Sequence, residues 1–185
     1  MSVVIHITGN PGSGKGTQSE LLISRMNFNH FSVGQLMRDE INAGTELGKQ
    51  LEIINQGKIA PADITMQCVK KHVTNPAYKR VVLDGFPRTV EQCVAYNEIV
   101  GPAHVTLIFE VDDKECMRRL LERSKSSGRS DDTEETMKVR FQQYYEKTAP
   151  TIEYVKNNMK YVVIDGRGTV EQVWELVKKA VEDVL

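Results

Sequence analysis

The sequence predicts an α/β fold, a five-stranded parallel sheet with helices on both faces. Two observations predict it. Five short strand-like runs recur along the 185 residues, and stretches with helical spacing lie between them, as in a parallel sheet covered by helices. A glycine-rich loop also joins the first run to a helix-like stretch. The expected strands are Val3–Thr8, His30–Ser32, Arg80–Leu83, Val105–Val111 and Tyr161–Ile164.

Length and composition fit one globular domain, residues 1–185, with an ordinary core. Hydrophobic residues make up 40% and the net charge is −1, which argues against a surface that binds nucleic acid polymers. Cys68, Cys93 and Cys116 lack metal-ligand spacing and are expected to be buried thiols in a reducing compartment. Because the first strand begins at residue 3 and no apolar run reaches membrane length, we expect a cytoplasmic protein with no membrane contact.

The glycine-rich loop, Gly9–Thr17, follows the first strand and precedes the helix-like stretch Gln18–Met26. Glycines allow backbone angles that other residues resist and let phosphate approach the chain. Backbone N–H groups and the helix N-terminus then face the anion, and Lys15 brings a full positive charge to it. This is the phosphate-binding P-loop pattern, and it predicts a P-loop three-layer fold. A strand-to-helix turn with a surface lysine is the disfavoured alternative.

Two later segments fit a compact sheet-and-helix layout less well. Residues 32–61 are helical in pattern but contain four glycines, and residues 124–131 are too polar to pack as core. We expect the second segment to lead into a helix capped by Asp132, with Glu135 completing a capping box. Pro150 is expected to end that helix or to kink it at Ala149.

The third strand ends in Asp84, and Arg88 follows in the next loop. A carboxylate at the carboxyl end of a strand beside a P-loop is placed to organise magnesium through water. The guanidinium of Arg88 is placed to bind a phosphate with two donors. The alternative, an aspartate that only caps the next helix, is less favoured in a chain that also has a P-loop.

Arginines adjoin the glycine-rich and polar segments. One P-loop lysine serves a single triphosphate, so the additional cations predict a second phosphorylated substrate. The four histidines lie in apolar segments or on a helix and are expected to be structural or surface residues. The five arginines are Arg38, Arg88, Arg123, Arg129 and Arg140.

These residues carry a resemblance to the adenylate kinases, in the nucleoside-monophosphate kinase family. The P-loop of that family likewise has Gly-Thr after the lysine. Four further strings are similar: Phe31–Arg38, Gly57–Pro61, Asp84–Thr89 with Gln92, and Gly128–Asp132 with Arg140, Tyr144, Thr148 and Pro150. Together they cover the chain from about Gly9 to Gly168.

The resemblance implies a reversible ATP:AMP phosphotransferase that needs magnesium and is a monomer. It implies a core of residues 1–31, 62–122 and 134–185, a mobile monophosphate-binding segment 32–61 and a short mobile lid 123–133 without structural zinc. Catalytic roles fall to Lys15, Arg88, Arg123, Arg129 and Arg140, and magnesium to Thr17 and Asp84. The implied ATP contacts are Gly12, Ser13, Gly14, Lys15, Gly16, Thr17, Arg123 and Gly168. The implied AMP contacts are Val33, Arg38, Lys58, Ile59, Ala60, Gly85, Arg88, Gln92, Arg129 and Arg140.

The acceptor base is expected to be adenine. Thr89 and Gln92 match the adenylate type, whereas the related UMP/CMP kinases have Asn at both places, and a Gln amide both donates and accepts. Val33, Gln35 and Ala60 depart from the usual Thr, Asp and Val. A UMP/CMP kinase is therefore the close alternative. A non-catalytic P-loop switch is the alternative from another class, and it would not need a second phosphate site.

Overall fold

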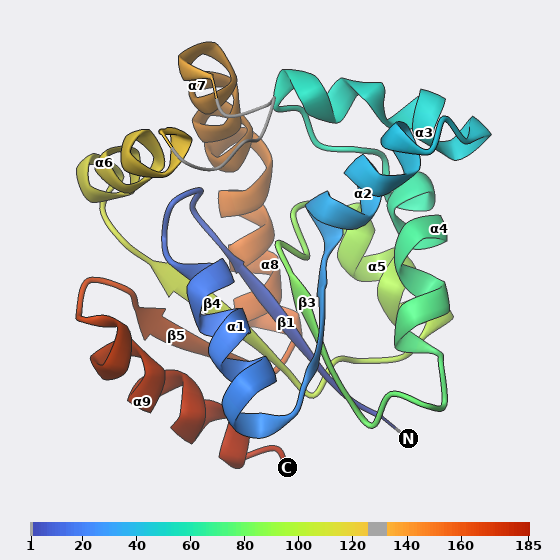
Figure 1. Ribbon diagram of the computed structural model, residues 1–185. Coiled ribbons are helices and arrows are strands. Elements are labelled where there is room, and N and C mark those ends of the chain that lie inside the picture. Colours follow the sequence, from blue (N-terminus) through green and yellow to red (C-terminus); the bar gives the residue numbers. More distant parts are fainter. Residues whose placement is uncertain (1, 126–132) are drawn as a thin grey trace.

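The computed structural model describes residues 2–125 and 133–185. Its centre is a five-stranded, all-parallel sheet in the order β2-β3-β1-β4-β5 (Figure 1). The predicted fold class is confirmed, and each expected strand is present with ends shifted by no more than one residue. The strands are β1 (Val3–Gly9), β2 (Asn29–Ser32), β3 (Arg80–Asp84), β4 (Val105–Glu110) and β5 (Tyr161–Asp165).

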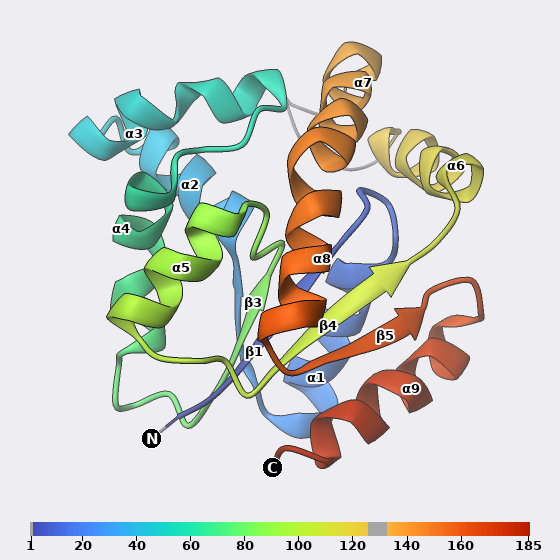
Figure 2. The same ribbon diagram turned by 180° about the vertical axis from the view of Figure 1, so that it is seen from behind.

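Helices cover both faces of the sheet. Alternate side chains of β1 point to opposite faces, so Ile5 packs in the cluster of α1 (Lys15–Met26) and α9 (Val170–Glu182). Val4 belongs to the cluster on the other face. Figures 1 and 2, seen from opposite sides, show α1 and α9 on one face and the remaining layer on the other. That layer is formed by α4 (Ala62–Val73), α5 (Val90–Ile99) and α8 (Ala149–Asn158).

The segment 32–61 forms a small helical unit above the carboxyl ends of β2 and β3 (Figure 1). Thr45 caps α3 by accepting a hydrogen bond from the Gly48 amide. Buried Met37 and Leu51 join this unit to the core cluster around α4. The elements are α2 (Val33–Asn42), α3 (Glu46–Leu51) and a 3-10 helix (Glu52–Gln56).

On the other side of the cleft, α6 (Asp113–Ser124) precedes α7 (Glu134–Gln143). The expected cap at Asp132 is wrong: α7 begins at Glu134, and its N-cap is Thr133, whose hydroxyl accepts from the Thr136 amide. The helix does not end near Pro150. Instead a π-helical turn, Tyr144–Thr148, joins α7 to α8, and Pro150 occupies the first turn of α8, where its missing N–H costs little.

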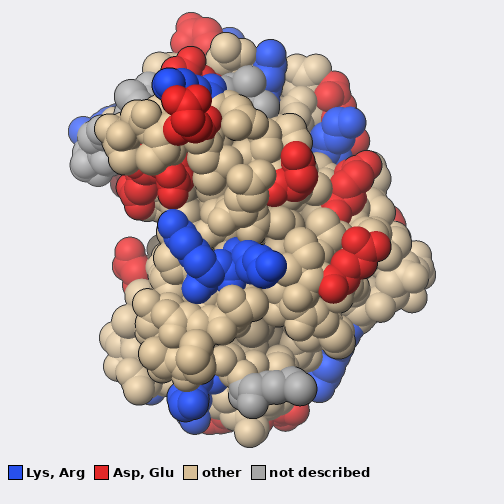
Figure 3. All heavy atoms as spheres, turned by 90° about the vertical axis from the view of Figure 1, so that its right-hand side faces the viewer, with Lys and Arg blue, Asp and Glu red and all other residues tan. Residues whose placement is uncertain are grey.

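Surface properties match the composition. Figure 3 shows acidic and basic side chains interspersed over the face on the right of Figure 1. None of the helices in residues 2–125 and 133–185 is long and apolar enough to cross a membrane. The three cysteines are free and buried, as predicted.

Candidate active site

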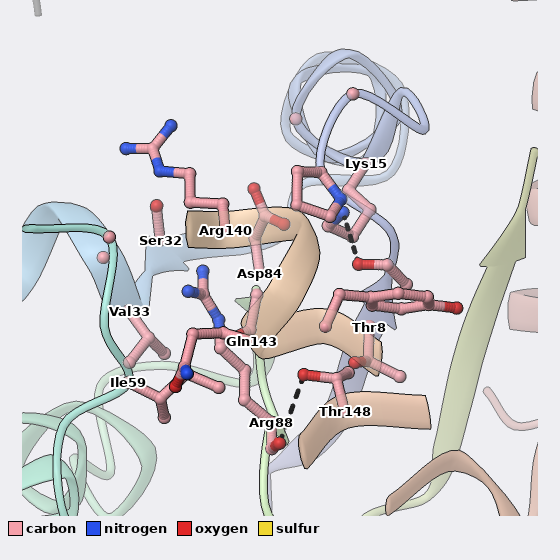
Figure 4. Close-up of a pocket in the computed structure, with 18 of the residues that line it drawn as sticks. Thr8, Lys15, Ser32, Val33, Ile59, Asp84, Arg88, Arg140, Gln143 and Thr148 are labelled. Carbon is pink, nitrogen blue, oxygen red and sulfur yellow. Dashed lines mark hydrogen bonds between the residues drawn. The ribbon is translucent and has the colours of Figure 1, made fainter. Parts of the chain in front are cut away.

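A cleft of about 560 Å³ opens at the carboxyl ends of β1 and β3, which are neighbours in the sheet. This edge is where open α/β sheets bind ligands. Ser32, Val33 and Ile59 lie on one side of it and Thr8 and Lys15 on the other (Figure 4). Most of the predicted contacts meet here. The predicted residues that line it are Gly12, Gly14, Lys15, Gly16, Thr17, Val33, Arg38, Lys58, Ile59, Ala60, Asp84, Gly85, Arg88, Gln92, Arg123 and Arg140.

The P-loop closes around its own lysine. Gly14 caps α1 with a φ of 94°, a left-handed conformation that favours glycine. The Lys15 ammonium donates to the carbonyl oxygens of Gly9 (2.9 Å) and Asn10 (2.7 Å) and to Ser13 Oγ (3.2 Å). Ser13 is buried and is not among the residues that line the cleft, so its side chain contacts Lys15 rather than the cleft.

Burial lowers the pKa of Lys15 to about 8. The carboxylate of Asp84 opposes this shift, whereas the guanidinium groups of Arg88 and Arg123 add to it. An anion placed among these three cations would satisfy charges that at present repel one another.

Asp84 brings a carboxylate beside the start of α1. A Cβ added to Gly16 would lie 3.8 Å from Asp84 Oδ2, and Thr17 next to it lines the same cleft. His30 Nε2 lies 3.4 Å from Asp84 Oδ2, a contact not predicted from sequence. Carboxylate and hydroxyl oxygens suit magnesium, which keeps several waters and bridges phosphates in such sites, so these residues fit the ion. Within the described residues no cluster of three or more acidic, His or Cys side chains offers a complete metal cage.

Two arginines converge at the start of α2. A Cβ added to Gly34 would lie 3.5 Å from Arg38 Nη1 and 4.0 Å from Arg88 Nη2. Gln35 Oε1 accepts from Arg38 Nε and Nη2, and Arg88 Nε donates to the Gly85 carbonyl (2.8 Å). Two oriented guanidinium groups beside a helix N-terminus have the geometry to hold a phosphate at a place separate from the P-loop.

The backbone of Arg88 is fixed by side chains from two separate parts of the chain. Its carbonyl accepts from Thr148 Oγ1 at 3.2 Å (Figure 4) and from Thr151 Oγ1 at 3.4 Å. Its amide donates to Gln92 Oε1 at 2.8 Å. The loop that carries the arginine is therefore held by α5, by the π-helical turn and by α8.

Next to the arginines, Gln92 lines the cleft together with Val33, Ile59 and Ala60, the residues expected to contact the acceptor base. Gln92 is 2% exposed. Its Nε2 lies 3.2 Å from Thr65 Oγ1 and 3.4 Å from the Ala60 carbonyl. The amide thus has protein partners on both ends.

Arg123 on α6 and Arg140 on α7 also line the cleft. Arg129 lies outside the described residues. Gly168 is not among the residues that line the cleft; Gly166, two residues earlier, approaches Ser13 instead.

Sequence reasoning missed Arg119, which lines the cleft and donates to the Gly166 carbonyl at 3.1 Å. It lies four residues before Arg123, on the same face of α6, and that spacing was the available signal. Gln143, three residues after Arg140 on α7, was missed for the same reason.

One cleft thus holds a P-loop with its lysine, a converging pair of arginines, Arg38 and Arg88, and further arginines from α6 and α7. This combination defines a P-loop phosphotransferase with sites for two phosphorylated nucleotides.

The adenylate kinase family model matches residues 7–160. An adenylate kinase of Flavobacterium johnsoniae is 38% identical, with 97% of this chain and 98% of the relative covered. One from Parabacteroides distasonis is 41% identical, covering 96% and 97%, and adenylate kinase 1 of Schistosoma mansoni is 36% identical, covering 94% and 90%. The chain belongs to the adenylate kinase family. The predicted resemblance is confirmed, and these names favour an adenylate kinase over a UMP/CMP kinase or a non-catalytic switch.

Proposed function

We propose that this protein transfers the terminal phosphoryl group of ATP to AMP, reversibly, to give two ADP. The observation that carries the proposal is the presence of two phosphate sites in one cleft, the P-loop at Lys15 and the arginine pair at Gly34. A non-catalytic nucleotide switch needs only the first.

The two walls have different tasks. Lys15 and the loop amides hold the triphosphate, and Arg38 and Arg88 hold the monophosphate so that its oxygen faces the transferred group in line. Arg123 and Arg140 also line the cleft, and they neutralise negative charge on the transferred phosphoryl group in the transition state. Phosphoryl transfer needs little else, because it depends on positioning and charge stabilisation.

The proposed reaction also requires magnesium. Thr17 and Asp84 would hold it through water, and the bound ion would neutralise charge on the phosphate oxygens. The supporting observation is the placement of the buried Asp84 carboxylate against Gly16 at the start of α1.

The segment 32–61 and the lid 123–133 are proposed to close over the substrates and exclude water, since water competes with AMP as acceptor. Arg129 would then contact phosphate and Gly168 would offer its backbone to the donor base. A cytoplasmic, monomeric enzyme is also proposed; its three cysteines are free.

The experiment is incubation of the purified protein with ADP and magnesium alone. Formation of ATP and AMP in equal amounts supports the proposal, and omission of magnesium should abolish it. Lys15→Met provides the catalytic control. Release of inorganic phosphate without ATP would contradict the proposal, because it would indicate hydrolysis.

The acceptor base is tested in the forward direction with ATP and AMP, UMP or CMP. We expect the highest kcat/KM with AMP. A higher value with CMP or UMP would contradict the adenylate assignment.

A further inference from the structure

Thr65 occupies a position that no motif of the sequence marks. It lies in the first turn of α4, with a fully buried side chain. Its hydroxyl donates to the Pro61 carbonyl at 2.8 Å. Because a hydroxyl has one proton, its oxygen is then left as an acceptor, and Gln92 Nε2 lies 3.2 Å from it.

The other end of the Gln92 amide is equally constrained. The Arg88 backbone N–H only donates, so the group 2.8 Å away must be the oxygen of Gln92. The nitrogen must then face Thr65. Hydrogen bonds thus run in one direction from Arg88 through Gln92 and Thr65 to Pro61, and this chain sets the orientation of the amide.

Amide orientation determines which purine the pocket prefers. Adenine presents an amino group beside an unprotonated ring nitrogen, so it needs an amide oxygen opposite the first and an amide N–H opposite the second. Hypoxanthine presents a carbonyl beside a protonated ring nitrogen and needs the reverse. An amide that rotates by 180° serves both bases, whereas a fixed one serves only one.

We propose that Thr65 is a positioning residue that fixes the Gln92 amide and thereby makes the acceptor site select AMP over inosine monophosphate (IMP). The inference rests on the proposed function, since it takes Gln92 as the residue that contacts the acceptor base. Arg88 opposes rotation of the amide from one end, and Thr65, together with the longer contact to the Ala60 carbonyl at 3.4 Å, opposes it from the other.

The test compares kcat/KM for AMP and IMP, with ATP as donor, in wild type, Thr65→Val and Thr65→Ser. Valine keeps the shape but removes the hydroxyl. We expect the AMP:IMP ratio to fall about five- to tenfold in Thr65→Val, as for loss of one hydrogen bond, mainly through a higher KM for AMP. Thr65→Ser, which keeps the hydroxyl, should retain the wild-type ratio.

Two controls separate positioning from packing. Thr74 also donates its hydroxyl to the carbonyl four residues earlier, but at the exposed end of α4; Thr74→Val should leave the ratio unchanged. In a Gln92→Leu background no amide remains, so adding Thr65→Val should not change the ratio further. Melting temperatures verify that each variant folds, and Thr65→Ala replaces Thr65→Val if the latter does not.

A ratio in Thr65→Val within twofold of wild type would overturn the inference, as would an equal loss of activity toward AMP and IMP. A full effect in the Gln92→Leu background would overturn it too. Failure of the proposed function is distinct, since wild type would then make no ATP and AMP from ADP.

Discussion

The two walls of the cleft are organised in opposite ways. We call the loop Gly9–Thr17 the P-loop wall, and the residues around Arg38, Arg88 and Gln92 the acceptor wall. On the P-loop wall, the ammonium of Lys15 is bonded to carbonyls and a hydroxyl of its own loop. On the acceptor wall, Gln35, Gln92 and Thr65 bond other side chains or backbone and hold them in place. In the proposed function the P-loop would therefore exchange internal hydrogen bonds for bonds to phosphate, whereas the acceptor wall is already arranged and would lose less conformational entropy on binding.

The largest expected effect on activity comes from removing the positive charge of Lys15. Lys15→Met should lower kcat about a hundred- to thousandfold, because a charge-stabilising donor is worth roughly 3–4 kcal/mol in the transition state. Lys179→Met, on the exposed end of α9, is the matched control. Activity within threefold of wild type would show that the P-loop assignment is wrong.

Lys15→Met should lower activity but not the free energy of unfolding. The pKa of Lys15 is lowered from 10.5 to about 8 by burial, so folding disfavours its charged form. At pH 7 the cost is at most about 3 kcal/mol. Lys15→Met should therefore keep or raise the melting temperature measured without nucleotide.

The acceptor wall should respond through specificity. Gln92→Leu should lower kcat/KM for AMP about ten- to a hundredfold, because the base and the Arg88 amide both lose a partner. Effects on UMP and CMP should be smaller. Val33→Thr, which adds only a hydroxyl, should change the ratio less than threefold. If Val33→Thr moved the ratio further than Gln92→Leu, Val33 would be the selecting residue.

The P-loop wall should also respond to pH. Free Lys15 loses its proton around pH 8, and phosphate binding raises its pKa, so ATP binding takes up a proton above that pH. Affinity for ATP should fall about five- to tenfold between pH 7.5 and 9, and calorimetry in buffers of different ionisation enthalpy should detect the proton uptake. In Lys15→Arg the affinity should not depend on pH in this range, because arginine remains charged.

The smallest expected effect comes from removing the hydrogen bonds by which Gln35 holds the Arg38 side chain. Gln35→Met removes the oxygen that accepts from Arg38 Nε and Nη2. Because this contact is exposed, we expect only about a two- to threefold rise in KM for AMP with kcat unchanged. A fall in kcat instead would place Gln35 nearer to the chemistry than this structure does.

Local patterns predicted the fold well. Apolar runs marked β1, β3 and β4, which are buried along most of their length, as parallel strands covered on both faces are. β2 and β5 are half-buried or partly exposed, and the alternation of strand-like and helix-like stretches indicated them instead. The P-loop and Asp84 were also predictable, because each follows a recognisable strand. Thr65 and the His30–Asp84 contact were not, since both depend on residues brought together by the tertiary fold. The cap at Asp132 was mispredicted because the chain offers a second capping residue, Thr133, one position later.

The π-helical turn at Tyr144–Thr148 makes the helix sensitive to its own length. Arg140 lies before the turn, and Thr148 and Thr151, which hold the Arg88 carbonyl, lie at its end and beyond. Successive α-helical residues are rotated by about 100°, so deleting one residue within the turn would restore an ordinary helix and rotate Arg140 by that angle relative to the threonines. A one-residue deletion at exposed Glu146 would thus remove Arg140 from the cleft without altering any residue that lines it.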